Sequence, residues 1–101
     1  MERGASVYIM MNFSNTSIYI GVTSKLLSGI ERHQNGVGSK FTSKYNCKKL
    51  IYFEFFSSME EATAREKQLN GWHREWKLNL VKEDNPEFED LYPGLVRLFE
   101  R

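Results

Sequence analysis

Residues 7–11 read VYIMM and residues 17–22 read SIYIGV, and these two short runs decide the fold. Both are rich in β-branched and aromatic residues, and the asparagines and serine between them are typical of a turn. The runs therefore predict a β-hairpin with antiparallel strands. Because side chains alternate along a strand, Tyr8 and Tyr19 both point away from the aliphatic face, and we expect them to share the other face of the hairpin.

Outward from the hairpin, the chain predicts one more strand and several helices. Apolar periodicity and stop signals place these elements as a helix over 24–35, a strand over 50–56, helices over 58–69 and 72–82, and a final helical segment within 88–101. Thr23 or Ser24 is expected to cap the first helix, and Ser58 with Glu61 forms a capping box at the start of the second. The sequence thus predicts an α/β (α+β) fold in which a three-stranded antiparallel sheet is flanked by helices.

Length and composition bound the organisation and location of the chain. A chain of 101 residues with 41% hydrophobic content can build one domain with one core, but not two. We expect a single domain over 1–101, with its core at about 6–92 and a C-terminal extension at 93–101. Cys47 is the only cysteine, which excludes an intramolecular disulfide and a cysteine-based zinc site. The lone cysteine and the short apolar run near the start predict a cytoplasmic protein with no membrane contact.

Charge is unevenly distributed, although the net charge is only +1. Residues 1–53 carry seven basic and two acidic side chains, whereas residues 54–101 carry seven basic and eleven acidic ones. A polyanion would therefore contact the first half of the chain.

The most basic stretch, residues 36–49, is expected to be a loop. It has no acidic residue and contains Lys40, Lys44, Lys48 and Lys49, with Phe41 and Tyr45 among them. A lysine-rich loop is often only solvated, but these lysines can equally contact phosphates. Both interpretations stay open at this point.

Three positions on the predicted helices are unusual. Glu66 falls within the apolar stripe of its helix, and a carboxylate facing a core needs either a salt bridge or a metal ion. His33 and Gly29 lie four residues apart at one edge of the apolar face of the first helix, where a histidine is more often a hydrogen-bonded core residue than a catalytic one. Glycine inside a helix costs about 0.5–1 kcal/mol relative to alanine.

In their order and spacing, these residues resemble the signature of the GIY-YIG nuclease superfamily, which includes intron-homing endonucleases and the amino-terminal incision domain of the bacterial excision-repair nuclease. The matching residues are Val7-Tyr8-Ile9, Tyr19-Ile20-Gly21-Val22-Thr23-Ser24, His33, Phe41-Thr42, Arg65-Glu66-Lys67-Gln68-Leu69, Trp72 and Asn85-Pro86. The chain is most similar to the small single-domain bacterial members, and the resemblance covers residues 7–92. A single YIG triplet is a weak signal, whereas the ordered set is specific.

The resemblance implies a metal-dependent DNA endonuclease. Tyr8 or Tyr19 would help to activate the attacking water, and His33 would assist proton transfer or hold a tyrosine. Glu66 would be the sole protein ligand of Mg²⁺ (or Mn²⁺), and Asn85 would support the site. One carboxylate with mostly water ligands suits Mg²⁺ when a substrate phosphate supplies the rest.

Gly29 departs from the family pattern, which places an arginine four residues before this histidine. Loss of one donor to a transition-state anion costs about 10²–10³ in rate, so the sequence predicts a weakened site. Arg32 is an imperfect substitute because it lies on another part of the helix surface, and Lys25 and Lys40 are further candidates. Natural decay of a nuclease and a sporadic or introduced change both explain the glycine.

Two other functions compete with a weakened nuclease. The main alternative is a non-catalytic nucleic-acid-binding module derived from the same fold. The other is a small interaction protein whose carboxy-terminal tail and Trp72/Trp76 face form a protein interface, although helical spacing favours a core position for both tryptophans. The chain has no room for a separate targeting module, so we expect DNA binding that is selective for structure rather than sequence, with an unknown protein partner as a further possibility for targeting.

Overall fold

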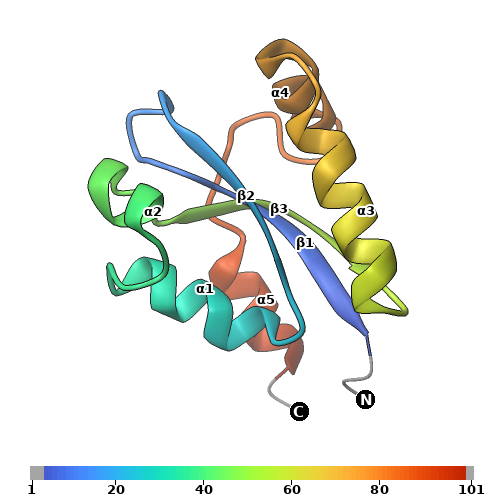
Figure 1. The fold of residues 1–101 in the computed structure, drawn as a ribbon. Coiled ribbons are helices and arrows are strands. Elements are labelled where there is room, and N and C mark those ends of the chain that lie inside the picture. Colours follow the sequence, from blue (N-terminus) through green and yellow to red (C-terminus); the bar gives the residue numbers. More distant parts are fainter. Residues whose placement is uncertain (1–3, 100–101) are drawn as a thin grey trace.

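The computed structural model describes residues 4–99, and an antiparallel sheet of three strands forms its centre (Figure 1). The strands are β1 (Ala5–Met11), β2 (Ile18–Thr23) and β3 (Lys49–Phe56). Their order is β2-β1-β3, so the first strand pairs with both others. The predicted hairpin and three-stranded sheet are therefore confirmed.

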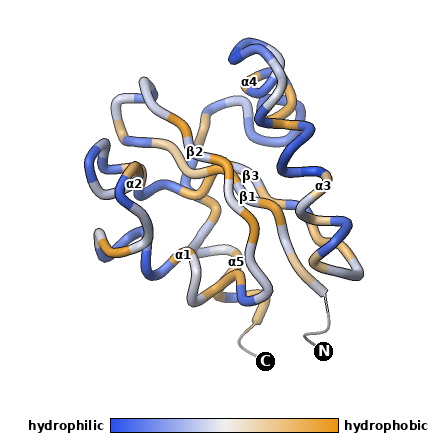
Figure 2. The backbone as a smooth tube through the Cα atoms, in the orientation of Figure 1, coloured by the Kyte–Doolittle hydropathy of each residue, from blue (hydrophilic) through white to orange (hydrophobic). Residues whose placement is uncertain are grey.

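Helices cover both faces of this sheet (Figure 1). They are α1 (Leu26–Gln34), α2 (Lys40–Tyr45), α3 (Met59–Asn70), α4 (Arg74–Lys82) and α5 (Tyr92–Phe99). One face packs against α3 and α4, and the other against α1 and α5. Apolar residues follow the strands at the centre, whereas the outer sides of the helices are largely hydrophilic (Figure 2). The predicted α+β fold class is confirmed.

β1 is buried along its whole length, and its alternation divides the core in two. Val7, Ile9 and Met11 join the cluster on the α3 side. Tyr8 and Met10 join the cluster on the α1 side. Side chains alternate along a strand, so Tyr8 points toward α1 because its neighbours Val7 and Ile9 point toward α3.

The first helix is shorter than the sequence predicts, and its expected cap is wrong. Lys25 occupies the N-cap position and its side chain makes no capping bond. Thr23 still belongs to β2, and its hydroxyl accepts a hydrogen bond from the Lys25 backbone N–H at 3.0 Å.

The predicted cap of α3 at Ser58 is confirmed, since the Ser58 hydroxyl accepts from the Glu61 N–H at 3.1 Å. The Glu61 carboxylate instead accepts from the Ser57 hydroxyl.

The expected basic loop over 36–49 is partly wrong, because α2 lies within it. This short helix of six residues is stabilised locally by a capping box between Ser39 and Thr42. Lys49 lies in β3 and is only 9% exposed, with its ammonium donating to the Asn15 side chain at 2.7 Å. Six residues are too few for an apolar periodicity, which is why the pattern did not reveal the helix.

The C-terminal third differs from expectation in its details. α4 begins at Arg74 rather than at Trp72, and Trp76 is 54% exposed, so its predicted core position is wrong. Trp72 packs against the core cluster on the α3 side. The final helix is α5, and residues 100–101 of its predicted range lie outside the described residues. Within residues 4–99, no helix combines the length and apolarity needed to cross a membrane.

Candidate active site

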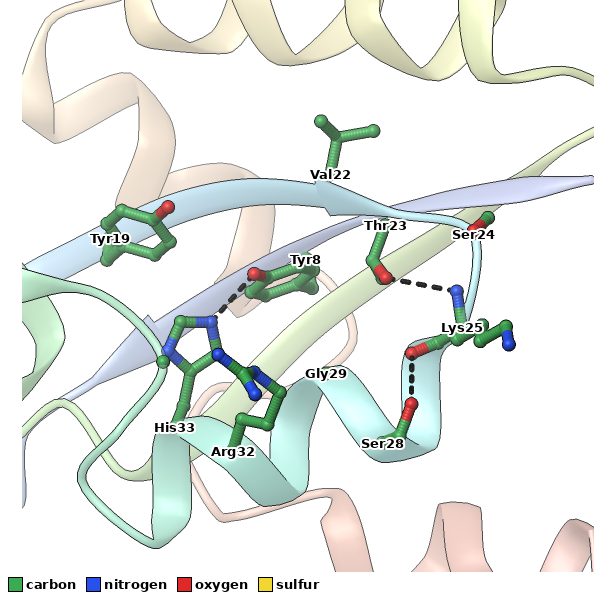
Figure 3. A pocket seen from close by; sticks show the side chains of 11 residues that line it. Tyr8, Tyr19, Val22, Thr23, Ser24, Lys25, Ser28, Gly29, Arg32 and His33 are labelled. Carbon is green, nitrogen blue, oxygen red and sulfur yellow. Dashed lines mark hydrogen bonds between the residues drawn. The ribbon is translucent and has the colours of Figure 1, made fainter.

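Tyr8, His33 and Thr42 form a chain of hydrogen bonds that runs from β1 through α1 to α2 (Figure 3 shows the first of them). Tyr8 Oη lies 2.7 Å from His33 Nε2, and His33 Nδ1 lies 2.9 Å from Thr42 Oγ1. His33 is only 3% exposed and Thr42 only 1%. Both ring nitrogens are therefore engaged, which holds the imidazole in one orientation.

Two glycines make room for this chain. Gly21 pairs with Tyr8 across the hairpin, and a Cβ at Gly21 would lie only 2.5 Å from Tyr8 Oη. A Cβ at Gly38 would overlap the ring of His33. Neither glycine was singled out as a site residue from the sequence, nor was Thr42. The signal for Gly21 was available, because the register of the hairpin places it directly opposite Tyr8.

Tyr19 lies on the same face of the sheet as Tyr8, as the hairpin pattern predicts. The centroids of the two phenol rings are 6.4 Å apart, and the His33 ring lies 5.4 Å from each. These three side chains border an open hollow that Gly29 and Arg32 also line, and we call it the tyrosine pocket (Figure 3).

Burial sets the protonation of the two hydrogen-bonded groups. Burial, with a smaller contribution from Tyr19, raises the pKa of Tyr8 far above its ordinary range. Burial, with a smaller contribution from the Arg32 charge, lowers the pKa of His33. At neutral pH, Tyr8 therefore keeps its proton and His33 is neutral. A neutral imidazole has one donor and one acceptor nitrogen, so when Nδ1 donates to Thr42, Nε2 is free to accept a proton from Tyr8.

We expect His33 to make the free energy of unfolding depend on pH. Its pKa is lowered in the folded protein, so the unfolded chain binds a proton more readily, beginning below about pH 6.5. Stability present at neutral pH is therefore lost as the pH falls from about 6.5 through the lowered pKa. Urea unfolding across this range should show the loss in the wild type and a flatter profile in His33→Gln. Equal slopes in both proteins would contradict this origin.

Glu66 lies on α3 at a second hollow, which we call the glutamate hollow. This hollow is lined by Ile18, Tyr19, Ile20, Phe41, Glu66, Asn70 and Lys77. The Glu66 carboxylate accepts a hydrogen bond from the Asn70 side chain. Tyr8 and His33 do not border this hollow, so the residues to which the resemblance assigns one reaction line two hollows that share Tyr19.

The surroundings of Glu66 bear on the two interpretations of its position, a salt bridge or a metal ion. In the described part of the chain the one salt bridge joins Arg65 to Glu54, so Glu66 is not held in an ion pair. The same residues contain no cluster of three histidine, cysteine or acidic side chains that could enclose a metal ion. The carboxylate is half-buried and accepts from Asn70, so it is open enough to serve as the one protein ligand of a hard divalent cation, whose other ligands would be water and phosphate.

The position of the family arginine is Gly29, which borders the tyrosine pocket without filling it. Arg32 lines the same pocket, and its charge acts on His33 (Figure 3). It also donates to the Val37 carbonyl at 3.3 Å. Lys25 borders the same pocket, whereas Lys40 does not. The pocket therefore retains a positive charge, placed almost one turn later in α1.

The structure does not bring Asn85 to either hollow. Its amide donates to the carbonyl oxygens of Ile51 and Glu89 at 3.1 and 2.9 Å, and its oxygen accepts from the Glu89 N–H at 3.0 Å. Asn85 is buried and ties the segment after α4 to β3. These contacts favour support of the fold, and a part in the reaction stays a prediction.

The predicted lysines lie in three different environments. Lys40 and Lys44 are exposed on α2, Lys48 is half-buried, and Lys49 is almost buried. Lys40 and Lys44 border a shallow surface hollow beside Ser39. These two lysines are thus the members of the set best placed to contact a phosphate.

Comparison with known proteins bears on the same segment. A family model described as the GIY-YIG catalytic domain matches residues 4–79. A UPF0213 protein of Clostridium perfringens is 40% identical over 88 residues, which covers 82% of this chain and 94% of that protein. A UPF0213 protein of Pediococcus pentosaceus is 32% identical over 89 residues, covering 88% and 93%. No solved structure gives a significant match. The family match includes β1, β2, β3 and all of α1 to α3.

Proposed function

This chain belongs to the GIY-YIG family, and we propose that it is a DNA endonuclease that depends on Mg²⁺ or Mn²⁺ and is weakened by Gly29. The observation that carries the proposal is the hydrogen-bonded chain from Tyr8 through His33 to Thr42. Tyr8 and His33 line a pocket that the cationic side chain of Arg32 also lines. The family implies binding of DNA and use of a divalent metal. We further propose that the chain selects DNA by structure rather than by sequence.

The hydrogen-bonded chain supports activation of water. Because its pKa is raised, Tyr8 cannot act as a free phenolate, but it can take a proton from water while passing its own to His33 Nε2. The hydroxide would attack phosphorus, and the bond to the leaving oxygen would break as that oxygen takes a proton from solvent. The imidazolium is held by its Nδ1–H, which donates to Thr42. Thr42 is a positioning residue, since its contact is with His33 rather than with the reacting atoms.

Glu66 would hold the metal, and Tyr19 would lie between that metal and the tyrosine pocket. A hard divalent ion supplies stabilisation of the negative charge on the leaving oxygen. Arg32 supports binding of the scissile phosphate from the other side. The missing arginine at position 29 leaves the transition state with one cation fewer than the family pattern provides.

The proposal is tested by cleavage of duplex, branched and single-stranded DNA with Mg²⁺, with Mn²⁺ and with a chelator. We expect slow cleavage that requires the metal. Glu66→Gln removes the charge but keeps the shape, and it should lower the rate by about 10-fold or more at limiting metal. Glu60→Gln, on the exposed side of the same helix, is the matched control. Equal rates in the two variants would exclude Glu66 as the ligand.

A second function, a non-catalytic DNA-binding module, is favoured by Gly29 alone. It predicts DNA binding by the wild type and no metal-dependent cleavage of any DNA, even when an arginine is placed at position 29.

Under either function, we expect Lys40 and Lys44 to contribute to the salt dependence of DNA binding. Each phosphate contact changes the slope of log K against log salt by about −0.9 on duplex DNA. Replacing both lysines by alanine should therefore flatten that slope by roughly two units. Binding titrations at several salt concentrations measure this. Lys82→Ala is the control, because Lys82 is exposed at the end of α4 and lines neither hollow. An unchanged slope in the double variant would place the contact surface elsewhere.

A further inference from the structure

Three aromatic side chains form a row on the surface, which we call the aromatic row: Tyr19, Phe41 and Tyr45. The Tyr19 and Phe41 ring centroids are 6.1 Å apart with an interplanar angle of 28°, and those of Phe41 and Tyr45 are 4.7 Å apart at 43°. Phe41 and Tyr45 are four residues apart on α2 and so share one side of the helix. Each is 41% exposed.

Packing of α2 does not explain the exposed part of this row. The buried residue of α2 is Thr42, and the helix is further fixed by its capping box with Ser39. Cys47, directly after the helix, is fully buried in the α1-side cluster. The chain thus anchors α2 without Phe41 and Tyr45, and part of each of these rings is left exposed to a ligand.

The row begins at the two hollows and runs outward from them. Tyr19 borders both the tyrosine pocket and the glutamate hollow, and Phe41 borders the latter. α2 lies beside the sheet at the end where β2 begins (Figure 1). A DNA strand that leaves these hollows on the side of α2 would pass over Phe41 and Tyr45.

Positive charge accompanies the row. Lys40 and Lys44 are exposed on the adjacent side of α2. Lys44 Nζ lies 5.4 Å from the centroid of the Tyr45 ring. Exposed aromatic rings in series beside cations are the features by which proteins hold single-stranded nucleic acid, with the rings on the bases and the cations on the backbone.

We propose that Phe41 and Tyr45 stack on unpaired bases next to the scissile phosphate, so that the substrate class is DNA with a single-stranded segment beside the cut. Within a duplex, both faces of each base are covered by its neighbours, and a protein ring cannot stack on them unless the base leaves the helix. The placement beside the cut rests on the proposed function. Preferential binding of unpaired DNA rests on the aromatic row alone.

The test compares the Kd of a short single-stranded oligonucleotide with that of the duplex of the same sequence, in buffer that contains a chelator. We expect the wild type to bind the single strand more tightly. The variant Phe41→Leu with Tyr45→Leu keeps apolar bulk but removes both rings, and it should raise the single-strand Kd by about 5- to 100-fold. Its duplex Kd should stay close to that of the wild type.

Two further variants keep the test decisive. Phe13→Leu replaces a ring in the β1–β2 turn that is more exposed, at 68%, and it should change neither Kd. Phe41→Trp with Tyr45→Phe keeps two rings and should retain the preference for the single strand, even if the leucine variant is unstable. Quenching of a 2-aminopurine base in the oligonucleotide should follow the rings in the same way. An equal loss on both DNA forms, or no loss, would overturn the proposal.

The Kd measurements in chelator separate this inference from the nuclease proposal, because they do not depend on cleavage. A single-strand preference that depends on the rings, without cleavage of any DNA, would sustain the aromatic row and refute the nuclease. Metal-dependent cleavage of DNA, together with no single-strand preference that depends on the rings, would sustain the nuclease and refute the aromatic row.

Discussion

Gly29→Arg is expected to raise the rate of DNA cleavage by about 10²-fold or more, because it returns a cation to the tyrosine pocket one turn before His33. The backbone can accept the side chain, since a Cβ at position 29 would meet Thr23 at ordinary contact distance, with its nearest atom at 3.4 Å. Arginine is also a better helix former than glycine, which should add up to about 1 kcal/mol to the free energy of unfolding. Nicking rates and urea unfolding measure the two effects.

Gly29→Ala separates the rate from the stability. Alanine should recover most of the added stability, because the gain comes from helix propensity, and none of the rate, because it has no charge. If Gly29→Arg binds Mg²⁺ and DNA yet cleaves no faster than Gly29→Ala, the binding-module function is the correct one.

Tyr8→Phe, introduced together with Gly29→Arg, should lower the cleavage rate by about 10²–10⁴-fold, which is the usual contribution of a positioned proton-transfer group. The substitution keeps the buried ring and removes only the oxygen that lies 2.7 Å from His33 Nε2. Single-turnover cleavage with saturating DNA measures this rate. DNA binding should be nearly unchanged, because the loss is expected in the chemical step.

Tyr92→Phe is the matched control for that substitution. It also removes a phenol oxygen from a hydrogen bond, with Glu31 at 2.6 Å, but lies outside both hollows. Tyr19→Phe completes the comparison, because Tyr19 makes no hydrogen bond to His33 in the described residues. A large loss with Tyr19→Phe and none with Tyr8→Phe would assign proton transfer to Tyr19.

Local pattern was sufficient for the hairpin and for the shared face of its tyrosines. The two runs of β-branched and aromatic residues specify strands, the short turn makes them antiparallel, and the alternation of side chains does the rest. Helical spacing placed His33 and Gly29 on one edge of the first helix, and the family resemblance then identified position 29 as that of a missing arginine. These features depend on residues close together in the chain, which is why they can be read from it.

Other features of the site depend on contacts between distant segments. The role of Thr42 arises from a hydrogen bond to His33 across nine positions, and that of α2 from a helix too short to show periodicity. The pattern placed Glu66 on the apolar stripe of its helix. It could not show that this helix packs on one face of the sheet while Tyr8 and His33 lie on the other.

The sequence by itself thus determined the sheet, the family and most of the chemical groups, because each is encoded in local spacing. Only the tertiary structure decided how these groups are arranged: two hollows that share Tyr19, a cation supplied by Arg32, and Asn85 and Lys49 turned to structural contacts. The physical reason is that these positions follow from how α1, α2 and α3 pack on the two faces of the sheet. Packing between distant segments is a property of the folded chain as a whole and not of any one stretch of it.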